Sequence, residues 1–202
     1  TFHVPYSGAD LDFGNVCLGA GGGKTLGFWT NKNGETLFKG TDSGAASLAM
    51  LVGLNLVNAG GIPFDPTTYA QVKTWFNNAT ATNMAYMLSA QLAAMELSVQ
   101  KGVVDGAALV YAPGVTGASA LGFISVTALM AEANTQLGLD GNTPSGDPNR
   151  AYQETVKNAL DHANNNLTFL QATACAIDFG TAGIIQQSVN SVPGMLLTRQ
   201  SQ

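Results

Sequence analysis

The sequence predicts an α+β fold that is mainly helical, with about five helices around a central apolar helix at residues 81–101. Apolar side chains recur every three or four residues through the middle of the chain, alternation with period two occurs near both ends, and 46% of the 202 residues are hydrophobic. This composition suffices for one core, so we expect a single domain over 1–202. Within it we expect a strand segment with a Gly-rich joint at 1–23, a helical body at 24–166, and a strand with an apolar C-terminal arm at 167–202.

The first 23 residues indicate extended chain that ends in a glycine-rich stretch. Phe2, Val4 and Tyr6 alternate with other residues, which is the period of a strand. Residues 19–23 contain four glycines and one alanine. We therefore expect one or two strands followed by a flexible joint.

Residues 25–39 contain an Asn-Gly pair between two apolar runs. In that setting Asn33-Gly34 predicts a β-hairpin. A short helix after the turn is the alternative, because residues 35–39 lack strict alternation.

Capping residues and periodicity predict the first helices of the body. Asp42 and Ser43 can cap a helix that runs to about Asn58, and Asp65, followed by proline, indicates a second start. The longest regular segment is 81–101, which carries a stripe of five apolar residues and further apolar residues on its other faces. The stripe consists of Met84, Leu88, Leu92, Met95 and Val99. We expect this helix to lie in the centre, packed on several sides.

Two more helices are expected in the second half of the body. Residues 103–112 indicate a small hairpin around an Asp-Gly turn. Ser125 can cap a helix that runs to about Leu137 and stops at Gly138. Asp147, again followed by proline, indicates the start of a helix that ends at the asparagines 164–166.

Beyond those asparagines the apolar period changes from the helical value to two. Residues 167–179 place Leu167, Phe169, Cys175, Ile177 and Phe179 on one parity, which predicts a strand. We expect this strand to pair with the N-terminal one in a small antiparallel sheet. Residues 180–202 contain one charged residue, Arg199, and are too apolar for an ordinary solvated tail.

The charge balance restricts the classes of partner. The formal net charge is −5, from 8 Lys and Arg against 13 Asp and Glu. Because phosphate binding needs a basic stripe, we expect no nucleic acid partner. No run of about 18 apolar residues occurs, so we also expect no membrane span.

The two cysteines indicate an oxidising compartment if they form a disulfide. Phe13 precedes Cys17 by four residues, and Phe179 follows Cys175 by four. On antiparallel strands with the cysteines opposed, the two phenylalanines are opposed as well, and we favour a Cys17–Cys175 bridge. Such a bridge would contribute about 4 kcal/mol in the chain-entropy model. Two buried free thiols are the alternative.

No motif in the chain predicts catalysis. Residues 19–25 are similar to a phosphate-binding loop, but Leu18 stands where its first glycine belongs. Ser119 lies in an incomplete nucleophile elbow, in which Leu121 replaces the second glycine. The only histidines are His3 and His162, and no cluster of metal-ligating residues occurs. We therefore expect no enzymatic activity, no catalytic residue, no cofactor and no metal.

Short polar patterns indicate a possible cation-binding loop and two possible glycosylation acceptors. Asp140, Asn142 and Asp147 could offer oxygen ligands to Ca²⁺, but their spacing is explained better by turns. Asn78 and Asn166 each begin an Asn-x-Thr sequence, which makes them candidate N-glycosylation acceptors.

Residues 25–35, Thr-Leu-Gly-Phe-Trp-Thr-Asn-Lys-Asn-Gly-Glu, and the Ala- and Met-rich segment 83–97 carry a resemblance. In these segments the chain resembles a group of exported bacterial proteins of uncharacterised function. The likeness extends over residues 25–112 and 148–166. It implies export and brings no catalytic residue with it. The first residue, Thr1, also fits a chain whose signal peptide has been removed, although a shortened chain would begin in the same way.

These observations favour an extracellular or cell-surface structural subunit that assembles with copies of itself into a filament or surface layer. Apolar terminal segments would make the contacts, because an extended segment on a sheet edge gains main-chain hydrogen bonds. The expected assembly residues are Phe2, Val4, Tyr6, Ile184, Ile185, Val189, Val192, Met195, Leu196 and Leu197. The alternative is a secreted hydrolase or a glycan- or ligand-binding module, with exposed Trp29, Trp75 or tyrosines as a sugar platform. We expect both tryptophans to be core residues instead.

Overall fold

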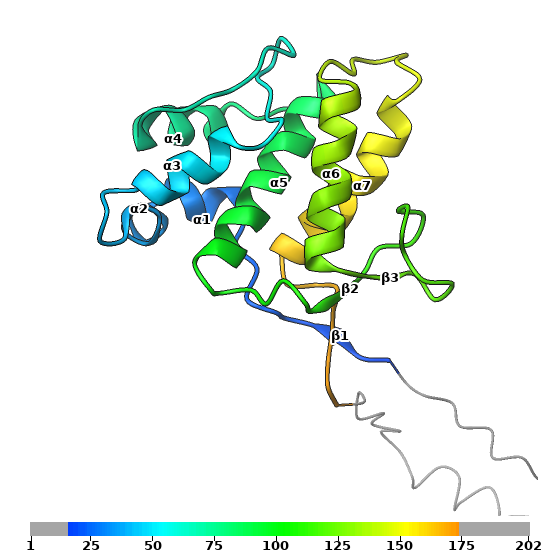
Figure 1. The fold of residues 1–202 in the computed structure, drawn as a ribbon. Coiled ribbons are helices and arrows are strands. Elements are labelled where there is room, and N and C mark those ends of the chain that lie inside the picture. The colour runs from blue at the N-terminus through cyan, green and yellow to red at the C-terminus, as the bar shows by residue number, and fades with distance from the viewer. Residues whose placement is uncertain (1–15, 174–202) are drawn as a thin grey trace, which may run out of the picture. The chain divides into compact units, whose positions relative to one another are not determined.

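The computed structural model describes residues 16–173, whereas 1–15 and 174–202 lie outside the described part. This part has seven helices and a four-stranded antiparallel sheet, so the predicted α+β, mainly helical class is confirmed (Figure 1). The helices are α1 Leu26–Thr30, α2 Lys32–Lys39, α3 Ala45–Val52, α4 Tyr69–Asn77, α5 Met84–Gln100, α6 Val126–Leu139 and α7 Arg150–Asn164. The strands are β1 Leu18–Gly19, β2 Leu109–Tyr111, β3 Phe123–Ser125 and β4 Phe169–Leu170.

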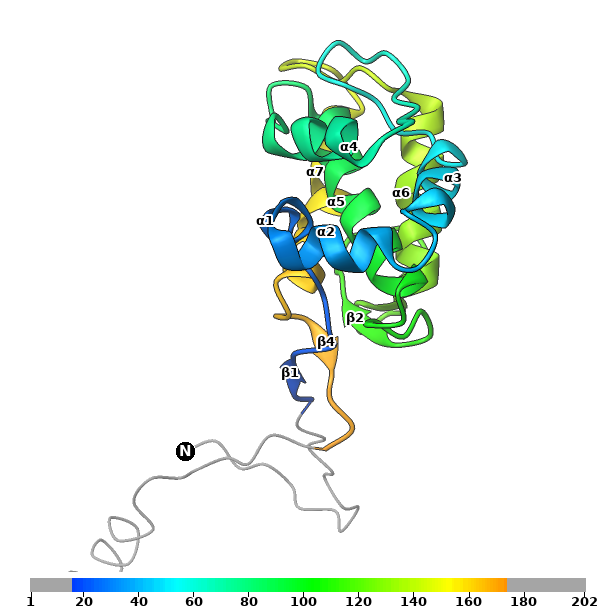
Figure 2. The same cartoon turned by 90° about the vertical axis from the view of Figure 1, so that its left-hand side faces the viewer.

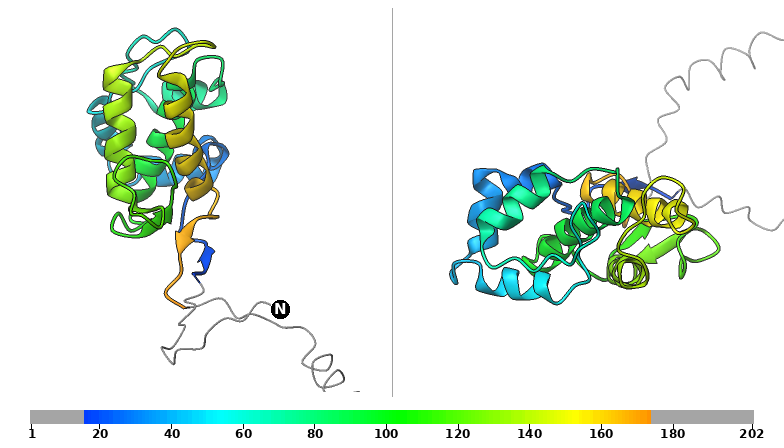
Figure 3. Two further views of the ribbon diagram at one scale, coloured as in Figure 1. Left: turned by 90° about the vertical axis from the view of Figure 1, so that its right-hand side faces the viewer. Right: turned by 90° about the horizontal axis from the view of Figure 1, so that it is seen from above.

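Helix α5 is the central element, as predicted from its apolar faces. The side chain of Asn83 caps it by accepting from the Ala85 N–H, and 13 of its 17 residues are buried. It packs against α6 and α7 on one side and contacts α1 and α3 on the other (Figures 1 and 3). The hydrophobic core of the body therefore forms around α5.

The hairpin predicted for residues 25–39 is wrong, and two short helices take its place. The Asn31 side chain caps α2 by accepting from the N–H groups of Asn33 and Gly34. A Cβ atom at Gly34 would lie 1.9 Å from the Phe28 carbonyl oxygen, so the glycine permits the close contact between α1 and α2. The Asn-Gly pair thus serves a helix start and a helix contact instead of a turn between strands.

Two helix boundaries differ from the prediction, although Asp42 accepts from the N–H groups of Gly44 and Ala46 at the start of α3 as expected. Helix α3 ends at Val52, not near Asn58. Helix α4 begins at Tyr69, where Thr68 and Gln71 form a reciprocal capping box, and not at the Asp65-Pro66 pair.

The second half of the body follows the prediction more closely. Ser125 caps α6 as expected, but the helix continues past Gly138 to Leu139. Helix α7 begins at Arg150, shortly after the predicted Asp-Pro start. The hairpin expected within 103–112 does not form, because Leu109–Tyr111 pairs with the distant strands β3 and β4.

The glycine-rich stretch predicted to be a flexible joint is tightly packed. A Cβ at Gly21 would lie 2.2 Å from the Phe169 ring, and one at Gly23 would lie 2.2 Å from the Ala163 carbonyl oxygen. Gly22 has a φ of +94° and lies against the backbone of residue 103. These glycines allow close approach between backbone segments, which is the opposite of a loose linker.

The sheet lies at one end of the helical body, with strand order β1-β4-β2-β3 (Figure 2). The predicted antiparallel pairing of an N-terminal with a C-terminal strand is present, with Leu18 opposite Leu170. In this register the Gln171 N–H donates to the Cys17 carbonyl at 2.8 Å, so the described ladder does not place Cys17 opposite Cys175. Cys17 is disulfide-bonded, whereas Cys175 lies outside the described residues. The Cys17–Cys175 pairing stays a prediction.

Candidate functional site

The sheet has one face against the helices and one exposed apolar face. Val110, Ile124 and Phe169 are buried, and they share a cross-strand row with Gly19. The neighbouring positions point the opposite way, because side chains alternate along a strand. On this exposed side, the solvent-exposed fractions are 37% for Leu18, 40% for Leu109 and 38% for Leu170.

The three exposed leucines form one continuous row. The β1–β4 register places Leu18 opposite Leu170, and the antiparallel register that pairs Val110 with Phe169 sets Leu109 beside Leu170. Tyr111 is exposed next to them and its ring centroid lies 5.5 Å from that of Phe123. We name this surface the outer face: Leu18, Leu109, Tyr111, Phe123 and Leu170. None of the four strands contains a charged residue.

The two edges of the described sheet differ. At β3, the N–H of Phe123 donates to the Ser119 side chain and its carbonyl accepts from the Ser119 N–H, so the adjacent loop closes this edge. At β1, the Cys17 carbonyl accepts from Gln171 in β4, and alternation turns the backbone groups of Leu18 away from β4. Within residues 16–173, β1 is therefore the open edge.

The predicted assembly residues at 2–6 and 184–197 all lie outside the described part of the chain. The structure does describe where the adjoining segments leave the body. Val16 precedes β1 and Thr173 follows β4, and these two strands are neighbours at the sheet end of the body (Figure 2). Val16 and Leu167 are exposed close to the same strands, at 52% and 59%.

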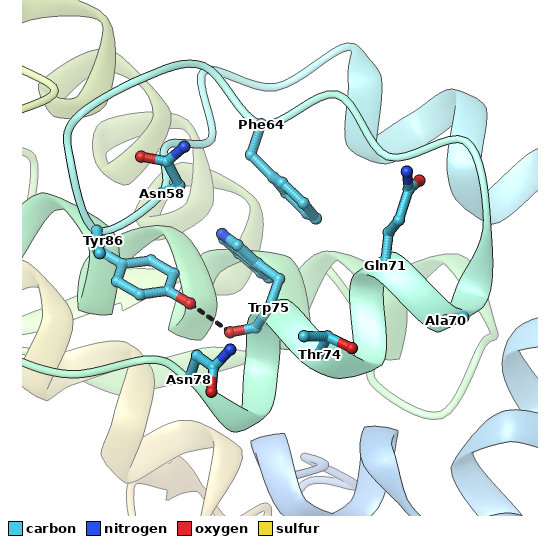
Figure 4. A pocket seen from close by; sticks show the side chains of 9 residues that line it. Asn58, Phe64, Ala70, Gln71, Thr74, Trp75, Asn78 and Tyr86 are labelled. Carbon is cyan, nitrogen blue, oxygen red and sulfur yellow. Dashed lines mark hydrogen bonds between the residues drawn. The ribbon is translucent and has the colours of Figure 1, made fainter.

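The second notable surface is an aromatic hollow of about 590 Å³ at helix α4 (Figure 4). Phe64 stacks on Trp75 with ring centroids 4.5 Å apart and an interplanar angle of 4°. Trp75 is held by its indole N–H, which donates to the Val57 carbonyl at 3.0 Å. Burial raises the pKa of Tyr86, whose hydroxyl donates to the Trp75 carbonyl beside the hollow. Asn58, Gln71, Thr74 and Asn78 line the rim.

Both tryptophans are core residues, as expected. Trp29 is fully buried and donates its indole N–H to the Ala94 carbonyl at 3.1 Å, while Trp75 is 5% exposed. Trp29 therefore offers no platform for a sugar, and Trp75 reaches the surface only where its ring lines the hollow beside Phe64.

The two candidate glycosylation acceptors have different environments. Asn166 has a φ of +61°, and its side-chain oxygen accepts from Gly21 and Gly22 at 3.2 and 2.9 Å. Its side-chain nitrogen donates to the Gly23 carbonyl at 3.0 Å. Asn78 is exposed at the C-terminal end of α4, and its side chain makes no hydrogen bond with another described residue. Asn166 is therefore a structural clamp that fixes the glycine-rich stretch to the end of α7.

The aspartates of the loop proposed as a possible Ca²⁺ site stabilise turns instead. Asp140 accepts from the Asn142 N–H at 3.0 Å and from the Asn149 side chain at 2.9 Å, and Asp147 accepts from the Asn149 N–H at 2.8 Å. Residues 16–173 contain no group of three or more His, Cys, Asp or Glu side chains that could hold a metal ion. Within this range, no helix combines the length and apolarity needed to cross a membrane.

The outer face could not be assembled from the sequence, although one local signal was present. The exposed-buried-exposed pattern of Leu109–Tyr111 is an ordinary strand alternation. Its significance depends on the pairing of β2 with β4, which joins segments far apart in the chain.

Comparisons with known proteins add no assignment to this geometry. No family model matches the chain, and neither a curated protein nor a solved structure gives a significant match.

Proposed function

We propose that this protein is an extracellular structural subunit that assembles with copies of itself, through apolar terminal segments, into a filament or surface layer. The observation that carries the proposal is the outer face with its row of exposed leucines at 37–40%. Apolar area in one contiguous patch, next to an open sheet edge, favours a protein contact over permanent exposure to water.

The occupant we propose is an extended segment from a second copy of the chain. Residues 2–6 alternate Phe2, Val4 and Tyr6, and 184–197 combine seven large apolar residues with uncharged polar ones and contain no charged residue. Such a segment could pair with the backbone groups of Leu18, which bond to no residue within 16–173, and place alternate side chains on the outer face. The absence of charged residues from all four strands removes a source of repulsion between copies.

The first and last described residues lie beside neighbouring strands, which supports the same proposal. Val16 and Thr173 flank two neighbouring strands, so both apolar terminal segments start from the sheet end of the body. If a terminal segment binds the outer face of a second copy, neither the segment nor the face takes part in the helical core, so that core can stay intact on assembly.

The first experiment is electron microscopy of the purified full chain beside a truncated chain that ends at Gly180. The truncated chain keeps Cys175 and every residue of the helical body. We expect the full chain to polymerise and the truncated chain to remain folded by circular dichroism without forming polymers. Normal polymers from the truncated chain would reject a role for residues 181–202, and unfolding would assign them to the core of their own subunit.

The alternative function is a secreted ligand-binding module, and the aromatic hollow at Phe64 and Trp75 is the observation that favours it. Its volume of about 590 Å³ lies within the range of small-molecule sites. A monodisperse monomer that binds glycans in solution would support this alternative against assembly.

A further inference from the structure

We propose that Asn78, and not Asn166, is the residue at which the exported chain accepts an N-linked glycan, and that the first sugar packs into the aromatic hollow. This inference rests on the proposed extracellular location. The two Asn-x-Thr sequences are equivalent as patterns, and their environments in the fold separate them.

Asn166 is unsuitable because its side chain holds the fold together. Both of its polar side-chain atoms bond to the backbone of residues 21–23, at distances of 2.9–3.2 Å. A sugar on its nitrogen would have to share the space through which that nitrogen reaches Gly23. The third residue of the pattern, Thr168, is only 7% exposed and its hydroxyl has no hydrogen-bond partner in the described part.

Asn78 has the opposite properties. It ends helix α4, its side chain is exposed, and no described residue uses its amide. Thr80, whose hydroxyl completes the acceptor pattern, is also exposed. Both side chains are thus exposed in the folded protein, and a glycan on Asn78 breaks no hydrogen bond between described residues.

The hollow beside Asn78 offers a suitable contact for a sugar ring. Phe64 and Trp75 provide an apolar surface, and Asn78 itself lines the hollow (Figure 4). The side-chain oxygens of Asn58 and Gln71 already accept from nearby backbone N–H groups. Their amide nitrogens donate to no other described residue, so they are available to sugar oxygens.

The modification is a glycosyl transfer from a lipid-linked oligosaccharyl diphosphate. A bond forms between Asn78 Nδ2 and C1 of the first sugar, and the bond from C1 to the diphosphate oxygen breaks. The lipid diphosphate leaves with the electron pair, and a proton from Nδ2 passes to a base of the transferase. The product is neutral at Asn78 and adds a bulky polar group to the surface.

The test is secretion of the full chain from a eukaryotic host that performs N-glycosylation, with site-specific mass spectrometry of the peptides. The matched variants are Thr80→Val and Thr168→Val, each of which removes one acceptor pattern and leaves its asparagine in place. We expect a glycan at Asn78 in the wild type and in Thr168→Val, and no glycan in Thr80→Val. A glycan on Asn166 in the folded protein, or an unmodified Asn78 in secreted Thr168→Val, would overturn the assignment.

Packing of the first sugar has its own readout. After trimming to a single sugar, the wild type should melt about 2 °C or more above Thr80→Val. That increment should disappear when both proteins also carry Phe64→Ala. An increment that is absent, or that survives the loss of Phe64, would contradict packing in the hollow. None of these measurements depends on polymer formation, so their failure is separable from failure of the assembly proposal.

Discussion

Asn166 shows how one side chain fixes a segment distant in sequence. It accepts from two glycine N–H groups and donates to a third glycine, and its φ of +61° is one that asparagine tolerates better than most residues. We expect Asn166→Ala to lower the free energy of unfolding by about 2–3 kcal/mol in urea titrations. Asn166→Gly should keep the positive φ without strain, so its effect measures the loss of the side-chain hydrogen bonds to residues 21–23 alone. A change below about 0.5 kcal/mol in Asn166→Ala would contradict the clamp.

Glu96 predicts a pH dependence of stability. Burial raises the pKa of this carboxyl group above its ordinary value. A raised pKa in the folded state favours folding at pH values below the unfolded pKa, and the advantage is lost as pH rises through the folded pKa. Glu96→Gln should therefore raise the free energy of unfolding at pH 7 and have little effect at pH 4, as measured by urea unfolding at the two pH values.

The matching control for Glu96→Gln is Glu154→Gln, which changes an exposed carboxyl group on α7.

Asp42 contributes a pH dependence of the opposite sign. Backbone hydrogen bonds from Ala46 and Gly44 lower the pKa of Asp42, so its contribution to stability rises with pH. The comparison is therefore the difference between each variant and the wild type at pH 4 and pH 7. An equal effect of Glu96→Gln at both pH values would show that burial of the charge is unimportant.

At the scale of elements, helix α5 determines the stability of the body. Leu88 and Leu92 have no exposed surface, and α5 contacts helices on two sides. Leu88→Ala should cost about 2–5 kcal/mol through lost burial and cavity formation, measured by urea unfolding. Leu139→Ala, on a side chain that is 73% exposed at the end of α6, should cost less than about 0.5 kcal/mol. Similar values for the two variants would mean that α5 is not the core element.

The glycine-rich stretch gives a second prediction for an element. A Cβ at Gly23 would lie 2.2 Å from the Ala163 carbonyl oxygen, whereas a Cβ at Gly27 in α1 would meet nothing closer than 3.9 Å. Gly23→Ala should lower the melting temperature by several degrees, and Gly27→Ala should raise the free energy of unfolding by about 0.5–1 kcal/mol. A Gly23→Ala protein as stable as the wild type would support the flexible joint that the sequence suggested.

Sequence patterns predicted the elements whose signals are local. Helix α5 has apolar residues on all faces, and Ser125 caps α6 through its own side chain. The pattern at Asn33-Gly34 was misleading because Gly34 is needed for contact with α1, and a hairpin turn and a packed helix both favour glycine. The same limit applies to the outer face, since Leu18, Leu109 and Leu170 meet only through strand pairing across the chain.

At the scale of the whole molecule, the helical body and the sheet end differ in which apolar side chains they bury and which they expose. The body buries both tryptophans, together with Phe38, Phe76 and Tyr86, in one core around α5. The sheet end leaves leucines exposed beside the open edge of β1, and the apolar terminal segments begin there. Low charge in the strands and an apolar acceptor surface are what assembly by an extended segment requires.

Assembly through the outer face is tested by comparing two double variants with the wild type by sedimentation velocity and electron microscopy. Leu109→Thr with Leu170→Thr changes the outer face and keeps residues that suit a strand. Ile62→Thr with Leu139→Thr changes two apolar side chains, exposed at 63% and 73%, that belong to none of the four strands or their connecting loop. We expect polymers from the wild type and the second variant, and folded monomers from the first. A wild type that stays monomeric, or equal polymerisation of both variants, would contradict it.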